Sequence, residues 1–319
     1  MTATTPPKWA VVVFAARESA ETIESTIEAI NQAVTEDDCQ IAILVNGNRN
    51  LADQLSRRYQ ERSYSPPKGI RIDIWFLEVG DKAQTWNAYV HRLYPGAELT
   101  FFVDGYAEPK PDALHLLSRA ISESPQALAV SGVPSCGSSA RWQAAVMLRS
   151  GGIHGNLFAL PKRTMEELRQ RAICLPKGLY RTDSLIGAIL NFRFDPSKHN
   201  WDPGQILVQG DATWKTNTLR WWHPGDIRTH VKRLLRQSQG QLENLAVSDH
   251  LGRHRRSPET LPPTARELVL QWWYGNTGPN WHRIALHPSW LFALRRMREI
   301  RDWSKADQAP SLIDSYPHP

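Results

Sequence analysis

This sequence of 319 residues lacks long hydrophobic runs, paired cysteines and a leader-like N-terminus. No apolar run approaches the ~20 residues that a helix needs to cross a bilayer, so no transmembrane segment is expected. The three cysteines, Cys39, Cys136 and Cys174, match no disulfide or metal-site spacing. Residues 1–8 are rich in Thr and Pro and carry no charged leader region. We therefore predict a flexible N-terminus, no secretory signal and a reducing, cytoplasmic compartment.

Acidic residues are fewer than basic ones, 32 against 38, which gives a net charge of +6. This excess favours anionic partners: nucleic acid, a nucleotide-sugar diphosphate or an anionic membrane surface. With 41% hydrophobic and 22% charged residues, the composition is that of a folded globular protein. The length is enough for one large domain or two ordinary ones.

The first 115 residues alternate between apolar runs typical of buried strands and amphipathic helical stretches. Continuous apolar runs are typical of strands that are covered on both faces. The alternation predicts a parallel, doubly wound α/β sheet. The expected strands are 9–14, 41–45, 70–77 and 99–103, and the expected helices between them are 21–34, 51–62 and 82–93.

Polar and charged residues follow each expected strand. Arg17 and Glu18 follow the first, Asn46 the second, Lys82 the third and Asp104 the fourth. The carboxyl ends of parallel strands gather ligands at one edge of such a sheet. Asp104 could hold a metal-bound diphosphate there, although Asp followed by Gly is also a common turn pair.

Five segments, taken in order, carry a family resemblance. Their sequences are VVFAARE (12–18), KAQTWNA (82–88), FFVDGY (101–106), GLYRTD (178–183) and RQSQG (236–240). The ordered set resembles inverting family 2 glycosyltransferases of the GT-A fold, and it extends over residues 9 to about 244. FFVDGY stands where that family has its metal-binding D-x-D, and GLYRTD stands where it has the segment with the catalytic base.

The resemblance implies a GT-A type doubly wound, mixed and mostly parallel sheet. The residues after it, rich in Trp and in helical patterns, predict a Trp-rich helical C-terminal extension. The resemblance also implies transfer of a sugar from a nucleoside-diphosphate donor with inversion. Asp183 would be the general base, and Asp104 would hold Mg2+ or Mn2+ on the diphosphate. Asp183 could instead be a helix N-cap. The implied donor-binding residues are Ala15, Arg17, Glu18, Asn46, Lys82, Asn87, Asp104, Gly105 and Arg236.

Tyr106 departs from the family pattern, because it stands where the second Asp of D-x-D would be. A phenol is a poor ligand for a hard metal ion. Glu108, His223 or His230 could complete a metal site. Otherwise Asp104 holds the metal alone with phosphates and water, or Lys82 and Arg236 stabilise the leaving group without it.

The remaining predictions concern domains and the acceptor. Residues 9–245 form the catalytic domain, with a donor half at 9–115 and an acceptor half at 116–245. A linker at 246–266, a helical extension at 267–307 and a disordered tail at 308–319 follow. The acceptor region is predicted around His154, Asn156, Trp221 and Trp222, although His154 also fits a packed core histidine.

Residues 288–303 read as a basic amphipathic helix with an apolar stripe. The stripe could dock against the main domain, or the helix could contact the inner face of a membrane peripherally. The acceptor is open between a saccharide, a lipid carrier, a peptide and a small metabolite.

Two other function classes stay open. One is a non-catalytic binding protein on the same scaffold, for which Tyr106 is the main support. The other is a basic nucleic-acid binder, which lacks a recognition motif, so no nucleic-acid partner is expected.

Overall fold

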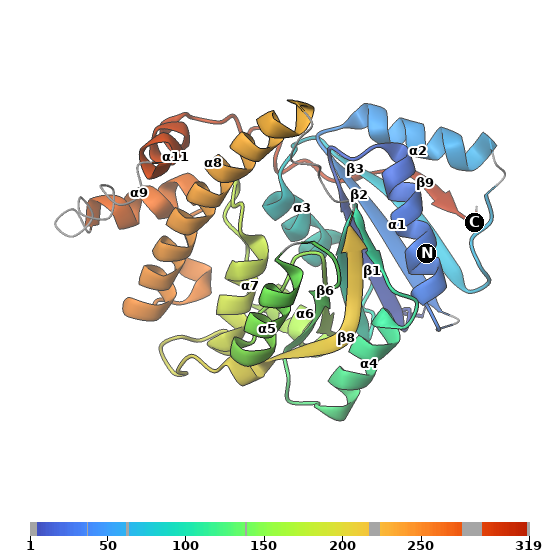
Figure 1. The fold of residues 1–319 in the computed structure, drawn as a ribbon, viewed down its shortest axis with the longest axis horizontal. Coiled ribbons are helices and arrows are strands. Elements are labelled where there is room, and N and C mark those ends of the chain that lie inside the picture. Colours follow the sequence, from blue (N-terminus) through green and yellow to red (C-terminus); the bar gives the residue numbers. More distant parts are fainter. Residues whose placement is uncertain are drawn as a thin grey trace.

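A single mixed sheet of nine strands runs through the molecule (Figure 1). The computed structural model describes residues 5–36, 38–61, 64–137, 139–216, 224–275 and 289–317, and within 224–235 only the backbone. The strand order is β5-β8-β6-β7-β4-β1-β2-β3-β9. Among the helices of these residues, none is both long and apolar enough to cross a membrane.

The centre of the sheet is the predicted parallel unit. Strands β4, β1, β2 and β3 lie side by side and all point the same way. A helix follows each strand, as the alternating pattern predicts. The bounds are β1 Trp9–Ala15, α1 Ala20–Ala33, β2 Cys39–Asn46, α2 Arg49–Glu61, β3 Ile70–Leu77, α3 Lys82–Ala88, the π-helical turn η1 Tyr89–Leu93, β4 Leu99–Asp104 and α4 Ala113–Glu123.

The second half of the sheet is mixed, which confirms the expected fold class. Strand β7 runs antiparallel between β4 and β6, β8 runs parallel to β6, and β5 pairs antiparallel with β8. The elements are β5 Ala107–Pro109, β6 Ala129–Pro134, α5 Ala140–Ser150, β7 Leu157–Pro161, α6 Lys162–Gln170, α7 Thr182–Asn191, η2 Pro203–Gln205 and β8 Ile206–Thr216.

Two hydrophobic clusters cover the two faces of the sheet, because successive strand residues point to opposite sides. Val11 and Val13 of β1 face a cluster with α1, α2 and α4. Val12 and Phe14 face a second cluster with α3, α6, α7 and the C-terminal helices. Phe102 lies in that second cluster with its ring stacked on Phe158 at 4.8 Å.

The C-terminal helices pack against the second cluster, and Figure 1 shows α8, α9 and α11 gathered together on one side of the sheet. Trp290, Leu294 and Met297 of α11 are buried in the second cluster, whereas Leu291 and Ile300 are exposed, so only part of the predicted apolar stripe docks against the domain. Membrane contact through this helix stays a prediction. The elements are α8 Pro224–Val247, the π-helical turn η3 Ser248–Arg253, η4 Pro258–Thr260, α9 Ala265–Gly275 and α11 Ser289–Arg298.

Two predictions about this region are wrong. The 246–266 segment is not a loose linker, because Val247, Leu251 and Pro258 are buried within it. The tail is not disordered, because β9 (Ser311–Tyr316) pairs antiparallel with β3. Without β9, the edge of β3 would expose unpaired backbone groups. Tyr316 is buried, and its hydroxyl donates to the backbone oxygen of Ser56 at 3.1 Å.

Candidate functional site

Asp104 ends β4 beside Phe14 of β1, at the carboxyl edge of the parallel strands. The next residue, Gly105, turns the chain sharply, and its N–H donates to the oxygen of Phe14 at 2.8 Å. A β-carbon at position 105 would lie 2.8 Å from that same oxygen. Only glycine therefore fits this close approach, which fixes where the Asp104 side chain leaves the strand.

The Asp104 carboxylate faces inward, with its side chain 13% exposed. Lys82, the first residue of α3, forms an ion pair with it. The Tyr106 hydroxyl donates to the other carboxylate oxygen at 3.1 Å. The negative charge of Asp104 raises the pKa of Tyr106 well above its usual range, and burial adds to this. Tyr106 therefore stays a protonated donor, which makes it a poor metal ligand.

Asn156, just before β7, reaches the same carboxylate. With its amide oriented to satisfy its neighbours, Nδ2 donates to Asp104 Oδ2 at 3.1 Å, and Oδ1 accepts from Trp214 Nε1 at 3.0 Å. The predicted acceptor residue Asn156 therefore lies beside the predicted metal and diphosphate residue.

Asp183, in the first turn of α7, joins this cluster through Gly155. Its Oδ2 accepts from the Gly155 N–H at 3.1 Å, and its Oδ1 accepts from the Ser184 N–H at 3.0 Å. A β-carbon at position 155 would lie 3.4 Å from Asp183 Oδ2 and 3.4 Å from Lys82 Nζ. Asp183 does not cap its helix, because Arg181 holds the cap position. The predicted base and the Lys82–Asp104 pair thus share one site.

His154 precedes Gly155 in the chain and packs on Trp214, with the ring centroids 4.8 Å apart. Its Nδ1 accepts from the Asn156 N–H at 3.2 Å. Burial lowers the pKa of His154, and the charges of Asp183 and Asp104 oppose that shift. The imidazole is therefore neutral at neutral pH, and its packing agrees with the reading of a core histidine at the edge of the site.

The loops after β1 and β2 hold one another in place. Asn46 Nδ2 donates to the oxygen of Ala15 at 3.1 Å. The Glu18 carboxylate accepts from the backbone N–H groups of Ala16 and Arg17 at 2.7 and 2.9 Å. These contacts shape the same carboxyl edge, while the donor-binding roles of Ala15, Arg17, Glu18 and Asn46 stay predictions.

Of the other predicted metal ligands, Glu108 forms an ion pair of its own, with Lys215 at 2.9 Å. His223, Trp221 and Trp222 lie outside the described residues, and His230 lies where only the backbone is described. Within the described part of the chain, no group of three His, Cys, Asp or Glu side chains could hold a metal ion. Among the described side chains, Asp104 is therefore the candidate ligand, and substrate phosphates could supply others.

Two buried carboxylates that sequence reasoning missed hold the loop before α7. Asp81 Oδ2 accepts from the N–H groups of Gly178 and Gln84 at 3.1 and 3.0 Å. Glu243 Oε2 accepts from Tyr180 and Arg181 at 3.0 Å each. Burial raises the pKa of both carboxyls, that of Glu243 to about 7. Asp81 stands one residue before an expected helix, so its N-cap position could have been predicted from the sequence. No local sequence pattern predicts the role of Glu243.

Gly240 and Arg236 belong to the same stretch of α8. A β-carbon at Gly240 would lie 2.7 Å from Arg181 Nε, so the helix packs directly on the loop before α7. The structure therefore brings together two of the segments that carry the family resemblance. Arg236 is half-buried four residues before Gly240, and its phosphate-binding role stays a prediction.

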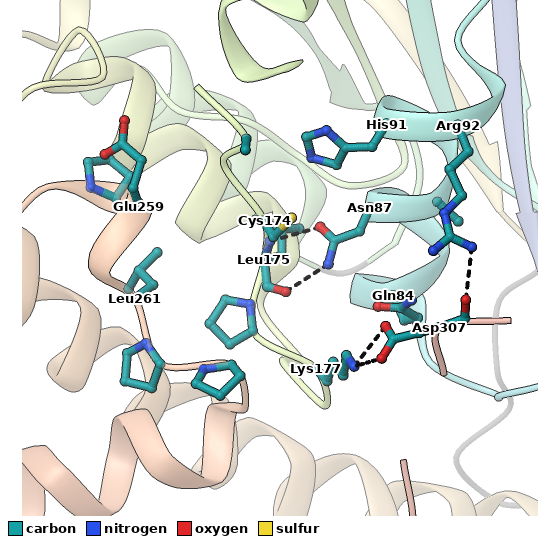
Figure 2. Close-up of a pocket in the computed structure, with 16 residues that line it drawn as sticks. Gln84, Asn87, His91, Arg92, Cys174, Leu175, Lys177, Glu259, Leu261 and Asp307 are labelled. Atoms are coloured by element: carbon teal, nitrogen blue, oxygen red, sulfur yellow. Dashed lines mark hydrogen bonds and ion pairs between the residues drawn. The ribbon is translucent and has the colours of Figure 1, made fainter. Parts of the chain in front are cut away.

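Asn87 lies elsewhere, on the wall of a cavity of about 260 Å3 (Figure 2). Its amide donates to the Leu175 oxygen at 2.9 Å and accepts from the Leu175 N–H at 2.8 Å. None of Lys82, Asp104 and Asp183 lines this cavity. The Asn87 amide therefore links α3 to the 173–177 segment through these two hydrogen bonds, instead of making the predicted contact with the donor.

We expect Asn87→Ala to lower the free energy of unfolding by about 2 kcal/mol, because it leaves two buried backbone groups of Leu175 without partners. The affinity for a nucleoside diphosphate should not change. Urea unfolding and a binding titration measure the two effects. A loss of nucleotide affinity at unchanged stability would restore the donor-binding role.

Comparison with known proteins supports the fold. No protein-family model matches the sequence, and no curated protein matches it. A mannosyltransferase from Pyrobaculum calidifontis, solved with GDP-Man and Mn2+, superposes with a TM-score of 0.59 at 18% identity. The match covers 95% of this chain and 79% of the other.

Two further solved structures superpose at similar levels. Glucosyl-3-phosphoglycerate synthase from Mycobacterium tuberculosis, solved with Mn2+, UDP-glucose and phosphoglyceric acid, has a TM-score of 0.51 at 15% identity, over 77% of this chain and 81% of that one. S. aureus TarS 1–349, solved with UDP, has a TM-score of 0.50 at 12% identity, over 91% and 80%. The chain therefore has the α/β fold expected from the sequence, which is the GT-A type fold of glycosyltransferases.

Proposed function

We propose that this protein transfers a sugar from a nucleoside-diphosphate donor to an acceptor, with inversion at the anomeric carbon. The observation that carries the proposal is the convergence of Asp104, Lys82 and Asp183 at the carboxyl edge of the parallel strands. That edge is where ligands bind in open α/β sheets. The structural neighbours solved with GDP-Man and with UDP-glucose support a nucleotide-sugar donor.

The residues divide the chemistry between two sides of the site. As the acceptor oxygen bonds to the anomeric carbon, its proton passes to the Asp183 carboxylate. The bond from that carbon to the diphosphate oxygen breaks, and the electron pair leaves with the diphosphate. Lys82 then lies close to the growing negative charge, which it stabilises in a partly buried site.

A divalent cation fits this arrangement through Asp104. Mg2+ and Mn2+ prefer oxygen ligands, and Mg2+ is often held by one or two carboxylates with substrate phosphates. Asp104 would be the protein ligand of the cation, and its ion pair with Lys82 would then be broken. When bound, the metal would neutralise charge on the leaving diphosphate. The two neighbours solved with Mn2+ support this assignment.

A thermal-shift panel of GDP and UDP, each with and without Mn2+, tests the proposal. We expect a nucleoside diphosphate to raise the melting temperature, because a ligand at 100 times its Kd stabilises the native state by about 2.7 kcal/mol. Asp104→Asn should remove the part of the shift that depends on Mn2+. Asp53→Asn, which changes an exposed carboxylate of α2, is the matched control.

Two outcomes would count against these roles. An unchanged Mn2+-dependent shift in Asp104→Asn would remove Asp104 from the metal site. Nucleotide binding by the wild type without any release of diphosphate from a nucleotide sugar would favour the non-catalytic binding protein.

A further inference from the structure

Arg181 lies beside the candidate site with a side chain that has no hydrogen-bond partner in the described part of the chain. Its Nε is buried and unpartnered. The contact found for its guanidinium is with the ring of Tyr180, at 5.9 Å to the centroid. A buried donor without an acceptor destabilises the folded state, and an anion bound at this point would offset that loss.

The chain is built to hold Arg181 in this position. Glu243 accepts hydrogen bonds from the backbone N–H groups of Tyr180 and Arg181, so the start of the side chain is fixed. Gly240 leaves room for the rest, because a β-carbon there would lie 2.7 Å from Arg181 Nε and 2.8 Å from its Cγ. The side chain therefore crosses α8 at a residue without a β-carbon.

Arg181 lies close enough to the site for its charge to influence the same group as the charges of Asp183, Asp104 and Lys82. The pKa of His154 responds to all four: it is raised by Asp183 and Asp104 and lowered by Lys82 and Arg181. Lys82 already has a counter-charge in Asp104. Glu243 is near Arg181, but its oxygens accept from backbone N–H groups and from Gln239, and it forms no ion pair with Arg181 in the described structure. Arg181 is thus a second cation near this site besides Lys82, and it has no acidic side-chain partner among the described residues.

We propose that Arg181 binds the diphosphate of the donor from the side of α7, opposite Lys82. This assignment rests on the proposed function. A guanidinium presents several N–H donors in one plane and binds phosphate oxygens in pairs, which a lysine does not. The loop before α7 would then carry both the base, Asp183, and a contact to the leaving group.

Isothermal titration of the full chain with GDP and UDP, in the presence of Mn2+, tests this role. We expect Arg181→Gln to weaken binding of the diphosphate about 10- to 100-fold, the range for a hydrogen bond between charged groups. The affinity of Arg181→Gln for GMP and UMP, which lack the second phosphate, should fall much less. Gly240→Ala should weaken diphosphate binding similarly, because it displaces Arg181 without removing its charge. Arg57→Gln, an exposed arginine of α2, is the matched control.

The outcomes separate this assignment from the proposed function. If the wild type binds neither GDP nor UDP, both the proposed function and the role of Arg181 are overturned. If it binds one of them, and Arg181→Gln and Gly240→Ala bind it as tightly, the role of Arg181 alone is overturned. Circular dichroism checks folding. Should Arg181→Gln not fold, Arg181→Lys decides, because a retained charge with fewer donors should bind the diphosphate more weakly than the wild type.

Discussion

Asp183→Asn should lower kcat by about 100- to 10,000-fold, the range for removing a general base. The carboxamide oxygen can still accept from the Gly155 N–H, so the loop geometry should survive. The amide, however, cannot take a proton from the acceptor hydroxyl. The affinity for the nucleoside diphosphate should stay at the wild-type level, because the diphosphate contacts assigned to Lys82, Arg181 and Asp104 are untouched.

The measurement is release of nucleoside diphosphate from GDP-mannose or UDP-glucose, whichever the wild type turns over, alongside a binding titration. Asp53→Asn removes an exposed carboxylate on α2 and serves as the control for a lost charge. Turnover of Asp183→Asn at the wild-type rate would show that another group takes the proton. Loss of donor binding together with turnover would indicate a structural role for Asp183.

Glu243 should make the stability of the protein fall as the pH rises. Burial raises the pKa of its carboxyl to about 7 from an ordinary value of 4.5. The native state therefore holds this proton more tightly than the unfolded chain. This contribution is fully present below pH 4.5 and is lost as the pH rises through 7. The loss amounts to about 3 kcal/mol, since one pKa unit corresponds to 1.36 kcal/mol.

The comparison that isolates this effect is between the wild type and Glu243→Gln, by urea unfolding at a series of pH values. Burial lowers the pKa of His91, His154 and His250, and these groups act in the opposite direction on acidification. They are present in both proteins, so they cancel in the difference. Two parallel curves would contradict a raised native pKa. Glu123→Gln, on the surface of α4, should give a curve parallel to the wild type.

Part of the candidate site was predictable because its signals are local. A buried parallel strand shows as a continuous apolar run, and its end shows as the first polar residue after it. Asp104 carries such a signal, whereas the family resemblance indicated Lys82 and Asp183. The structure places all three at one site. The sequence did not reveal that Lys82 would pair with Asp104, because that contact depends on how α3 lies against β4.

The contacts that were missed or mistaken join segments that lie far apart in the chain. Glu243 holds Tyr180 across 63 positions, and Asp81 holds Gly178 across 97. Asn87 bonds to Leu175 across 88 positions. The tail was predicted to be disordered, yet β9 pairs with the edge strand β3, and no local pattern of the tail predicts that pairing.

By itself, the sequence determined the alternation of strands and helices, the carboxyl edge where Asp104 lies, and the order of segments resembling glycosyltransferases. Hydrophobic periodicity and turn-forming residues are properties of neighbouring positions, so they can be recognised in the sequence without a structure. Only the tertiary structure decided which carboxylates are buried, that Arg181 Nε has no hydrogen-bond partner among the described residues, and that the C-terminal segment completes the sheet. These features depend on which distant surfaces pack together, and burial sets both the pKa values and the unmet hydrogen bonds that follow.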